Sequence, residues 1–247
     1  MISVDTIYQR VLATANKEQR GYVTPQEFNL FANQAQMDIF DQYFYDVDKF
    51  SKVHGNETEA GDMLDLLNEK VDIFEMKNQA IGTGCTTLPS LPLFPEIYIL
   101  GNIFYTSVAG RPREVERVSE KEFATIINSI LTQPTEEKPI YVRDGRPAGV
   151  DLVRVFVDNP AGIPVQATAG CTCNYTRRPI DANWNFTVVN GYAQYNATGS
   201  IDFELHPSEE NNLVHRILEL AGIVMKDANL YQIASQEEIK DIQLEKS

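Results

Sequence analysis

The sequence predicts an α+β fold: an N-terminal helical pair, a central antiparallel β-rich region with one inserted helix, and a C-terminal long helix with a tail. Three observations predict it. Apolar residues recur at helical spacing near both ends of the chain, they alternate with polar residues through the middle, and capping boxes mark helix starts. The change of period separates a helical part, residues 1–75 together with 203–247, from a β-rich part, residues 76–202.

The first 46 residues predict two amphipathic helices and the joint between them. Apolar residues from Val4 to Ala15 recur at helical spacing, and Gly21 is a stop signal. Thr24 and Glu27 then form a capping box, with Pro25 preset for the first helical turn. The second helix has an aromatic face that is too apolar for a solvated helix, and its polar residues form no catalytic set. That face comprises Phe28, Phe31, Ala32, Ala35, Ile39, Phe40, Tyr43 and Phe44.

The middle of the chain predicts strands around one inserted helix. A polar loop at residues 51–62 leads into a short helix or a helix-to-strand passage at residues 63–74. Ser119 and Glu122 form a second capping box, and the helix that they open has apolar positions through Leu131 and ends before Pro134. The expected strands, which include an antiparallel meander, are residues 97–108, 113–118, 139–143, 150–157, 165–175, 184–189 and 191–195.

The C-terminal helix is expected over residues 208–226, with Ser208 as its N-cap. The tail that follows Asp227 has too little apolar surface to fold by itself, so it either frays or docks on a neighbouring subunit. Arg177 and Arg178, in so acidic a chain, predict a surface or intersubunit ion pair rather than a phosphate site. The candidate partner-interface residues are these two arginines and the apolar residues of the tail, Leu230, Tyr231, Ile233, Ile239 and Ile242.

The net charge of −14 excludes a clamp on nucleic-acid phosphates, which requires a basic surface. An acidic wall suits a channel through which DNA passes without adhering, and Glu57, Glu59, Asp62 and Asp65 are candidates for that wall. No apolar run is long enough to span a membrane, and no secretory leader is evident, so we expect a protein that is used in the cytosol or leaves it by lysis.

The residues that usually carry catalysis are few and scattered. His54, His206 and His215 lie far apart in sequence, and no nucleophile, phosphate-loop or metal-ligand motif accompanies them. Three cysteines cannot all pair, which indicates a reducing compartment, and Cys171 and Cys173 are expected to be small core residues on one face of a strand. We therefore predict a protein that is not an enzyme, without catalytic residues, cofactor or metal.

Two blocks of sequence resemble virion structural proteins of tailed bacteriophages, particularly crAss-like and related marine phages. The first block is residues 16–40, NKEQRGYVTPQEFNLFANQAQMDIF, and the second joins DFELHPSEE at residues 202–210 with ILELAGIV at 217–224 and KDANLYQ at 226–232. The resemblance is specific in these blocks and brings no catalytic signature.

The resemblance implies a head–tail connector subunit, an adaptor or ring protein below the portal that forms part of the DNA-conducting neck or tail channel. Its expected partners are other copies of itself in a twelvefold cyclic ring, the portal protein, and adjacent tail or ring proteins, with DNA passing without specific binding. It is expected in the virion after assembly in the host cytoplasm. The alternatives are a tail-tube or tail-hub component, or a virion-associated lytic or depolymerase enzyme.

Overall fold

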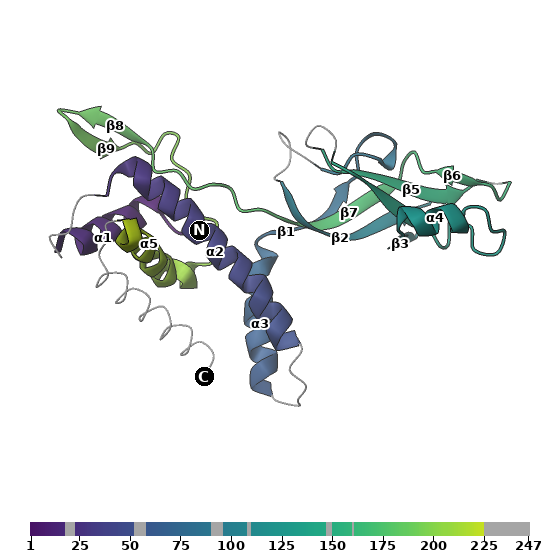
Figure 1. Cartoon of the computed structure of the whole chain (residues 1–247), viewed down its shortest axis with the longest axis horizontal. Coiled ribbons are helices and arrows are strands. Elements are labelled where there is room, and N and C mark those ends of the chain that lie inside the picture. Colours follow the sequence, from purple (N-terminus) through teal and green to yellow (C-terminus); the bar gives the residue numbers. More distant parts are fainter. Residues whose placement is uncertain are drawn as a thin grey trace. The chain divides into compact units, whose positions relative to one another are not determined.

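The computed structural model describes residues 1–17, 23–51, 58–89, 96–107, 110–146, 150–159 and 161–224. Within these ranges the chain forms five α-helices, a mixed seven-stranded sheet and a two-stranded sheet, which confirms the α+β class (Figure 1). It divides into unit 1, Met1–Ile73 with Pro179–Ser247, and unit 2, Phe74–Arg178. Residues 179–202, which the alternating pattern assigned to the β-rich part, are thus grouped with the helices.

Unit 1 is built on four helices: α1 (Val4–Lys17), α2 (Pro25–Ser51), α3 (Thr58–Asp72) and α5 (Glu210–Val224). The first predicted capping box is present, because Glu27 N–H donates to Thr24 Oγ1 at 3.3 Å and Thr24 N–H donates to Glu27 Oε2 at 3.0 Å. The bonds that the Glu27 carboxylate accepts from the Thr24 N–H and the Thr24 hydroxyl hold the pKa of this carboxyl below its usual value. Most of the predicted apolar face of α2 is buried, and only Phe31 and Phe44 are half-buried.

Two helix starts in unit 1 differ from the prediction. Helix α3 begins at Thr58, inside the segment expected to be a loop. Gly61 lies within this helix, and a glycine there costs only about 1 kcal/mol relative to alanine, which does not prevent the helix from forming. Helix α5 begins only at Glu210, after the 3-10 turn Pro207–Glu209. The cap of that turn is His206, whose Nδ1 accepts from the N–H of Ser208, and not Ser208 itself.

A buried ion pair connects α3 to the start of α5. Lys70 Nζ lies 2.6 Å from Glu209 Oε1, and the two side chains are only 5% and 2% exposed. Glu209 Oε2 also accepts from Asn212, and the Lys70 ammonium lies 5.7 Å from the centre of the Tyr43 ring on α2. Since a buried charge is costly without a close partner, this pair fixes the register of α3 against the other two helices.

The segment between residues 179 and 206 is largely irregular, and side chains of α1 and α2 satisfy its polar groups. The Asn29 side chain accepts from the Trp184 N–H at 2.8 Å and donates to the Trp184 carbonyl at 3.2 Å. Gln36 donates to the Ile180 carbonyl at 2.9 Å, and its own oxygen accepts from the Glu204 N–H at 3.4 Å. Two amide side chains of α2 thus hold the segment along the helix.

Unit 2 is a curled sheet formed by β1 (Glu75–Ala80), β2 (Ile97–Thr106), β3 (Pro112–Arg117), β4 (Ile140–Gly145), β5 (Leu152–Asp158), β6 (Pro164–Gln166) and β7 (Cys171–Arg177). The strand order is β1-β7-β2-β3-β4-β5-β6. Strands β3 and β4 are parallel, joined by the crossover that contains α4 (Glu120–Ile126), and the other neighbours are antiparallel. The antiparallel meander predicted from the sequence is limited to β4, β5 and β6.

Two elements of unit 2 end earlier than the sequence predicts. Residues 165–175 do not form one strand, because the chain turns at Gly170, whose φ is +82° and where a side chain would collide with the Thr106 carbonyl oxygen. Helix α4 keeps its predicted Ser119 capping box but ends at Ile126. Ile130 and Leu131, expected on its apolar face, are instead 87% and 96% exposed.

Residues 81–88 pack on the core of unit 2 and form hydrogen bonds with two strands that are not neighbours in the sheet. Ile81 donates its N–H to the Cys171 carbonyl of β7 at 3.0 Å, and Leu88 donates to the Asp151 carbonyl beside β5 at 3.1 Å. The sheet therefore curls so that β7 and β5 face one apolar cluster. That cluster comprises Ile81, Cys85, Leu88, Ile103, Val115, Tyr141, Val153, Val155, Val157, Ala167, Cys171, Cys173 and Tyr175.

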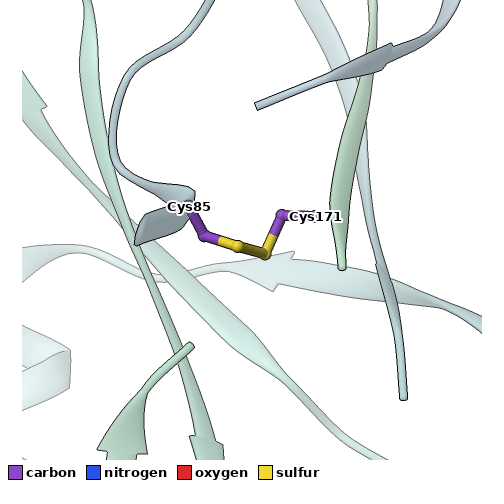
Figure 2. Close-up of a disulfide and its surroundings, with 2 residues drawn as sticks. All are labelled: Cys85 and Cys171. Atoms are coloured by element: carbon purple, nitrogen blue, oxygen red, sulfur yellow. A yellow bond between two sulfur atoms is a disulfide. The ribbon is translucent and has the colours of Figure 1, made fainter. Parts of the chain in front are cut away.

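A disulfide joins this segment to the sheet, which corrects the prediction of reduced cysteines. Figure 2 shows Cys85 bonded to Cys171, with their Cα atoms 5.6 Å apart. Cys171 and Cys173 share the buried face of β7 as expected, but only Cys173 keeps a free thiol. Burial raises the pKa of the Cys173 thiol to about 12, so this neighbour is a poor nucleophile toward the disulfide.

We predict that Asn29→Ala destabilises the protein by about 2–4 kcal/mol, because it leaves two backbone groups of Trp184 without partners. Guanidinium unfolding measures the loss. The matched control is Asn33→Ala, one turn further along α2, where the side-chain oxygen has no hydrogen-bond partner among the described residues. The control should cost less than about 1 kcal/mol. Equal losses for the two variants would contradict the role given to Asn29.

We predict that reductant lowers the melting temperature of the wild type but not that of the Cys85→Ala/Cys171→Ala double variant. The bond spans 86 residues, and on the chain-entropy scale its loss costs roughly 4–5 kcal/mol. Thermal scans with and without dithiothreitol measure this difference. An intact mass that shows all thiols free before reduction would contradict the disulfide directly.

Candidate functional site

A hairpin with exposed apolar side chains, formed by β8 (Phe186–Val189) and β9 (Tyr192–Tyr195), projects from the helices of unit 1 (Figure 1). Val189 pairs with Tyr192 across a two-residue turn. The turn residues, Asn190 and Gly191, have φ values of 51° and 83°, as a type I′ turn requires. The sequence predicted this strand-turn-strand, although not a functional role for it.

Trp184 forms the root of the hairpin and is 2% exposed. Besides its backbone bonds to Asn29, its indole Nε1 donates to Asp5 Oδ1 of α1 at 2.9 Å. The Tyr8 ring of α1 packs against the indole with ring centres 4.3 Å apart. Contacts with both α1 and α2 therefore fix the position of Trp184, from which the hairpin projects.

The inner face of the hairpin is packed at its root and open toward its tip. Phe186 and Tyr195 lie on this face, and each ring centre is 5.8 Å from that of Trp184. Side chains alternate along a strand, so Val188 and its cross-strand partner Ala193 lie on the same face, one step further out. Val188 is 68% exposed. The apolar inner face of the hairpin thus extends beyond the part that Trp184 covers.

The hairpin is uncharged although the chain as a whole is acidic. Residues 183–201 contain no Asp, Glu, Lys or Arg, whereas 23% of the chain is charged. On the outer face Val189 is 47% exposed and Tyr192 is 80% exposed. Loss of charge together with exposed tyrosine and valine is the composition of an interface core, not of a surface that stays in water.

A groove lies between the hairpin and α1. It has a volume of about 750 Å³ and takes one wall from α1 and the other from β9. Its lining is largely aromatic, apolar or amide, and Asp5, its one carboxylate, accepts the indole bond. The lining residues are Asp5, Tyr8, Gln9, Leu12, Trp184, Gly191, Tyr192, Ala193, Gln194 and Tyr195. Such a groove suits an apolar polypeptide segment rather than an ion or a phosphate.

Arg177 and Arg178 belong to unit 2 and have partners in their own chain. Arg178 Nη1 lies 3.9 Å from Glu96 Oε2, and Arg146 binds the other oxygen of the same carboxylate at 2.5 Å. The Arg177 guanidinium lies 5.7 Å from the centre of the Phe74 ring. The predicted ion pair therefore exists within the subunit, and a role for these arginines between subunits stays a prediction.

The structure does not test the other residues predicted for an interface or a channel wall. Asp65 is exposed on α3, Glu59 and Asp62 fall within the bounds of that helix, and Glu57 lies outside the described residues. The apolar tail residues also lie outside the described residues: Leu230, Tyr231, Ile233, Ile239 and Ile242. An acidic lumen stays a prediction.

The described part of the chain brings together no group of three or more His, Cys, Asp and Glu that could hold a metal ion. His206 caps the turn before α5, His215 lies within α5, and His54 is outside the described ranges. Among the helices that the structure describes, none is long and apolar enough to cross a membrane. The projecting hairpin and its groove are therefore the site that the described geometry supports.

No known protein-family model matches this chain, and no curated protein sequence matches it.

We predict that Val188→Lys and Tyr192→Lys leave the melting temperature of the isolated subunit within about 2 °C of the wild type. Both side chains are largely exposed, so a lysine at either position reaches water. Tyr195→Ala, the contrasting variant, removes a ring packed on Trp184 and should lower the melting temperature by several degrees. If Val188→Lys costs as much as Tyr195→Ala, the hairpin surface is covered within the subunit.

Proposed function

We propose that this chain is a structural subunit of a tailed-phage virion, a head–tail connector that assembles with copies of itself into a ring below the portal. The observation that carries the proposal is the projecting, uncharged hairpin, because a rigidly rooted apolar surface serves contact with other polypeptides. The phage context comes from the two sequence blocks, residues 16–40 and 202–232, that resemble virion structural proteins.

The two blocks lie far apart in the sequence, yet their described residues pack together in unit 1. Helix α5, which carries residues 217–224 of the second block, packs against α2, which carries most of the first block. Gln36 of the first block bonds Glu204 of the second at 3.4 Å. The resemblance thus covers contacting residues of one packed unit, which supports its being structural in origin.

A closed ring needs two different complementary surfaces on each subunit. The hairpin of unit 1 offers one. Unit 2 offers another apolar surface where Ile130, Leu131 and Ile163 are 87%, 96% and 58% exposed, and a bond of 2.9 Å from Gln133 to the Gly162 carbonyl brings these two loops together. Two distinct exposed surfaces fit a subunit with heterologous neighbours, including the portal and adjacent tail or ring proteins.

Charge and redox state fit the same role. A net charge of −14 suits a channel that conducts DNA without binding it. The Cys85–Cys171 disulfide suits a protein that leaves the host cytoplasm with the particle, since disulfides persist in oxidising surroundings such as virion surfaces. The proposed location is the neck or tail of the virion, with assembly in the host cytoplasm.

We predict that the chain is found by mass spectrometry in purified virions and that the isolated protein forms particles of about twelve times its 27.9 kDa mass. Mass photometry measures the second property. Val188→Lys combined with Tyr192→Lys should abolish the particles, because each new charge must be desolvated at the contact. Tyr45→Lys, which replaces an exposed tyrosine of α2, is the matched control and should assemble. Absence from virions, with a monomer under all conditions, would overturn the proposal.

A further inference from the structure

We propose that the groove between α1 and the β8–β9 hairpin binds residues 228–236 of a neighbouring copy's C-terminal segment. The proposal rests on the proposed function as a ring subunit and specifies the contact by which one subunit holds the next. Its three supports are the chemistry of the groove, the sequence of the segment, and the place at which the described chain ends.

The groove is complementary to an apolar, uncharged chain. Its β9 wall includes Ala193, and the cross-strand partner of Ala193, Val188, lies on the same face of the hairpin and is 68% exposed. Gln9 of α1 lines the same cavity and supplies an amide group, which can bond a polypeptide backbone without adding charge. A volume of about 750 Å³ holds several side chains.

Residues 228–236, ANLYQIASQ, have the matching sequence. They contain no charged residue, and Leu230, Tyr231 and Ile233 supply aromatic and aliphatic side chains. Charged pairs, Lys226–Asp227 and Glu237–Glu238, bound the stretch on both sides. An uncharged centre between charged ends is the pattern of an interface core with a polar rim.

The geometry of α5 favours the groove of another copy over that of the same subunit. Helix α5 begins beside α1, where Arg10 Nη1 lies 3.0 Å from Glu210 Oε1 and 3.4 Å from Asn211 Oδ1. Arg10 adjoins Gln9, which lines the groove. From Glu210 the helix carries the chain about 21 Å before it ends at Val224. Tyr231 is seven residues beyond Val224, a span of at most about 25 Å, so the segment reaches the groove of its own subunit only as a nearly fully extended chain that runs back along α5.

Such a contact is heterologous, because the segment of one copy occupies the groove of the next and leaves its own groove for the previous copy. Repetition closes a ring when the rotation closes. The uncharged contact also lets strongly acidic copies approach one another at a point where like charges do not meet.

A photo-crosslinking experiment on the full-length protein tests the proposal. The photoreactive amino acid benzoylphenylalanine replaces Tyr231 in unlabelled protein, which is mixed with ¹⁵N-labelled wild type before irradiation. We expect crosslinked peptides in which an unlabelled residue 231 is joined to labelled peptides from α1 or residues 191–195. The control carries the same group at Tyr45, which is 68% exposed on α2, and should give no crosslink to the groove.

A groove variant provides the second measurement. Ala193→Arg places a long charged side chain in the cavity and should reduce the mixed-isotope crosslinks at least tenfold, whereas Ala193→Ser should retain them. Melting temperatures of both variants establish that each is folded. If Ala193→Arg unfolds the subunit, Leu12→Arg on the opposite wall, also tested for folding, replaces it.

Each outcome decides the proposal. Mixed-isotope crosslinks at the groove that Ala193→Arg removes support it. Crosslinks confined to unlabelled chains mean that the segment folds back on its own subunit, and crosslinks elsewhere or none mean that the groove has another occupant; both overturn it. Groove crosslinks from a protein that is absent from virions would refute the proposed function and leave the docking contact standing.

Discussion

The structure of unit 1 depends on how the irregular segment from residue 179 to 206 satisfies its backbone polar groups. A buried N–H or carbonyl without a partner costs about 1–3 kcal/mol, and this segment has few regular partners. Asn29 and Gln36 of α2 supply the missing bonds at Trp184, Ile180 and Glu204. These bonds hold Trp184 against α2, so the hairpin that follows Trp184 begins at a fixed position on the helices of unit 1.

Local signals in the sequence predict local structure well. The capping boxes at Thr24 and Ser119 and the Asn190–Gly191 turn all form as predicted, because each depends on residues within a few positions. Prediction from the sequence fails where the structure depends on contacts between residues that are far apart in the chain. The bond between Cys85 and Cys171 and the turn at Gly170 against Thr106 require knowledge of the curled sheet. Strand β1 has no clear alternation because its register against β7 shifts between Met76 and Gln79.

The candidate site was visible in the sequence as a hairpin but not as a surface. Residues 183–201 are uncharged, yet residues 159–176, which include all of β7 except Arg177, are also uncharged. The two stretches differ in burial. Alternate side chains of β7 are buried, whereas Val188 and Tyr192 of the hairpin are 68% and 80% exposed. Conversely, Arg177 and Arg178 were conspicuous in sequence but have partners within unit 2. Charge depletion combined with exposure is the signal that identifies the hairpin as a candidate interface.

The central claim is that the hairpin is an interface between subunits of a virion ring. Cryo-electron microscopy of the assembled particle tests it most directly, because the side-chain density of Trp184, Val188 and Tyr192 identifies the hairpin in a map. We expect β8 and β9 to lie at the contact between adjacent copies, with a segment of the neighbouring chain between β9 and α1. A ring in which the hairpin faces solvent and the groove is empty would contradict it.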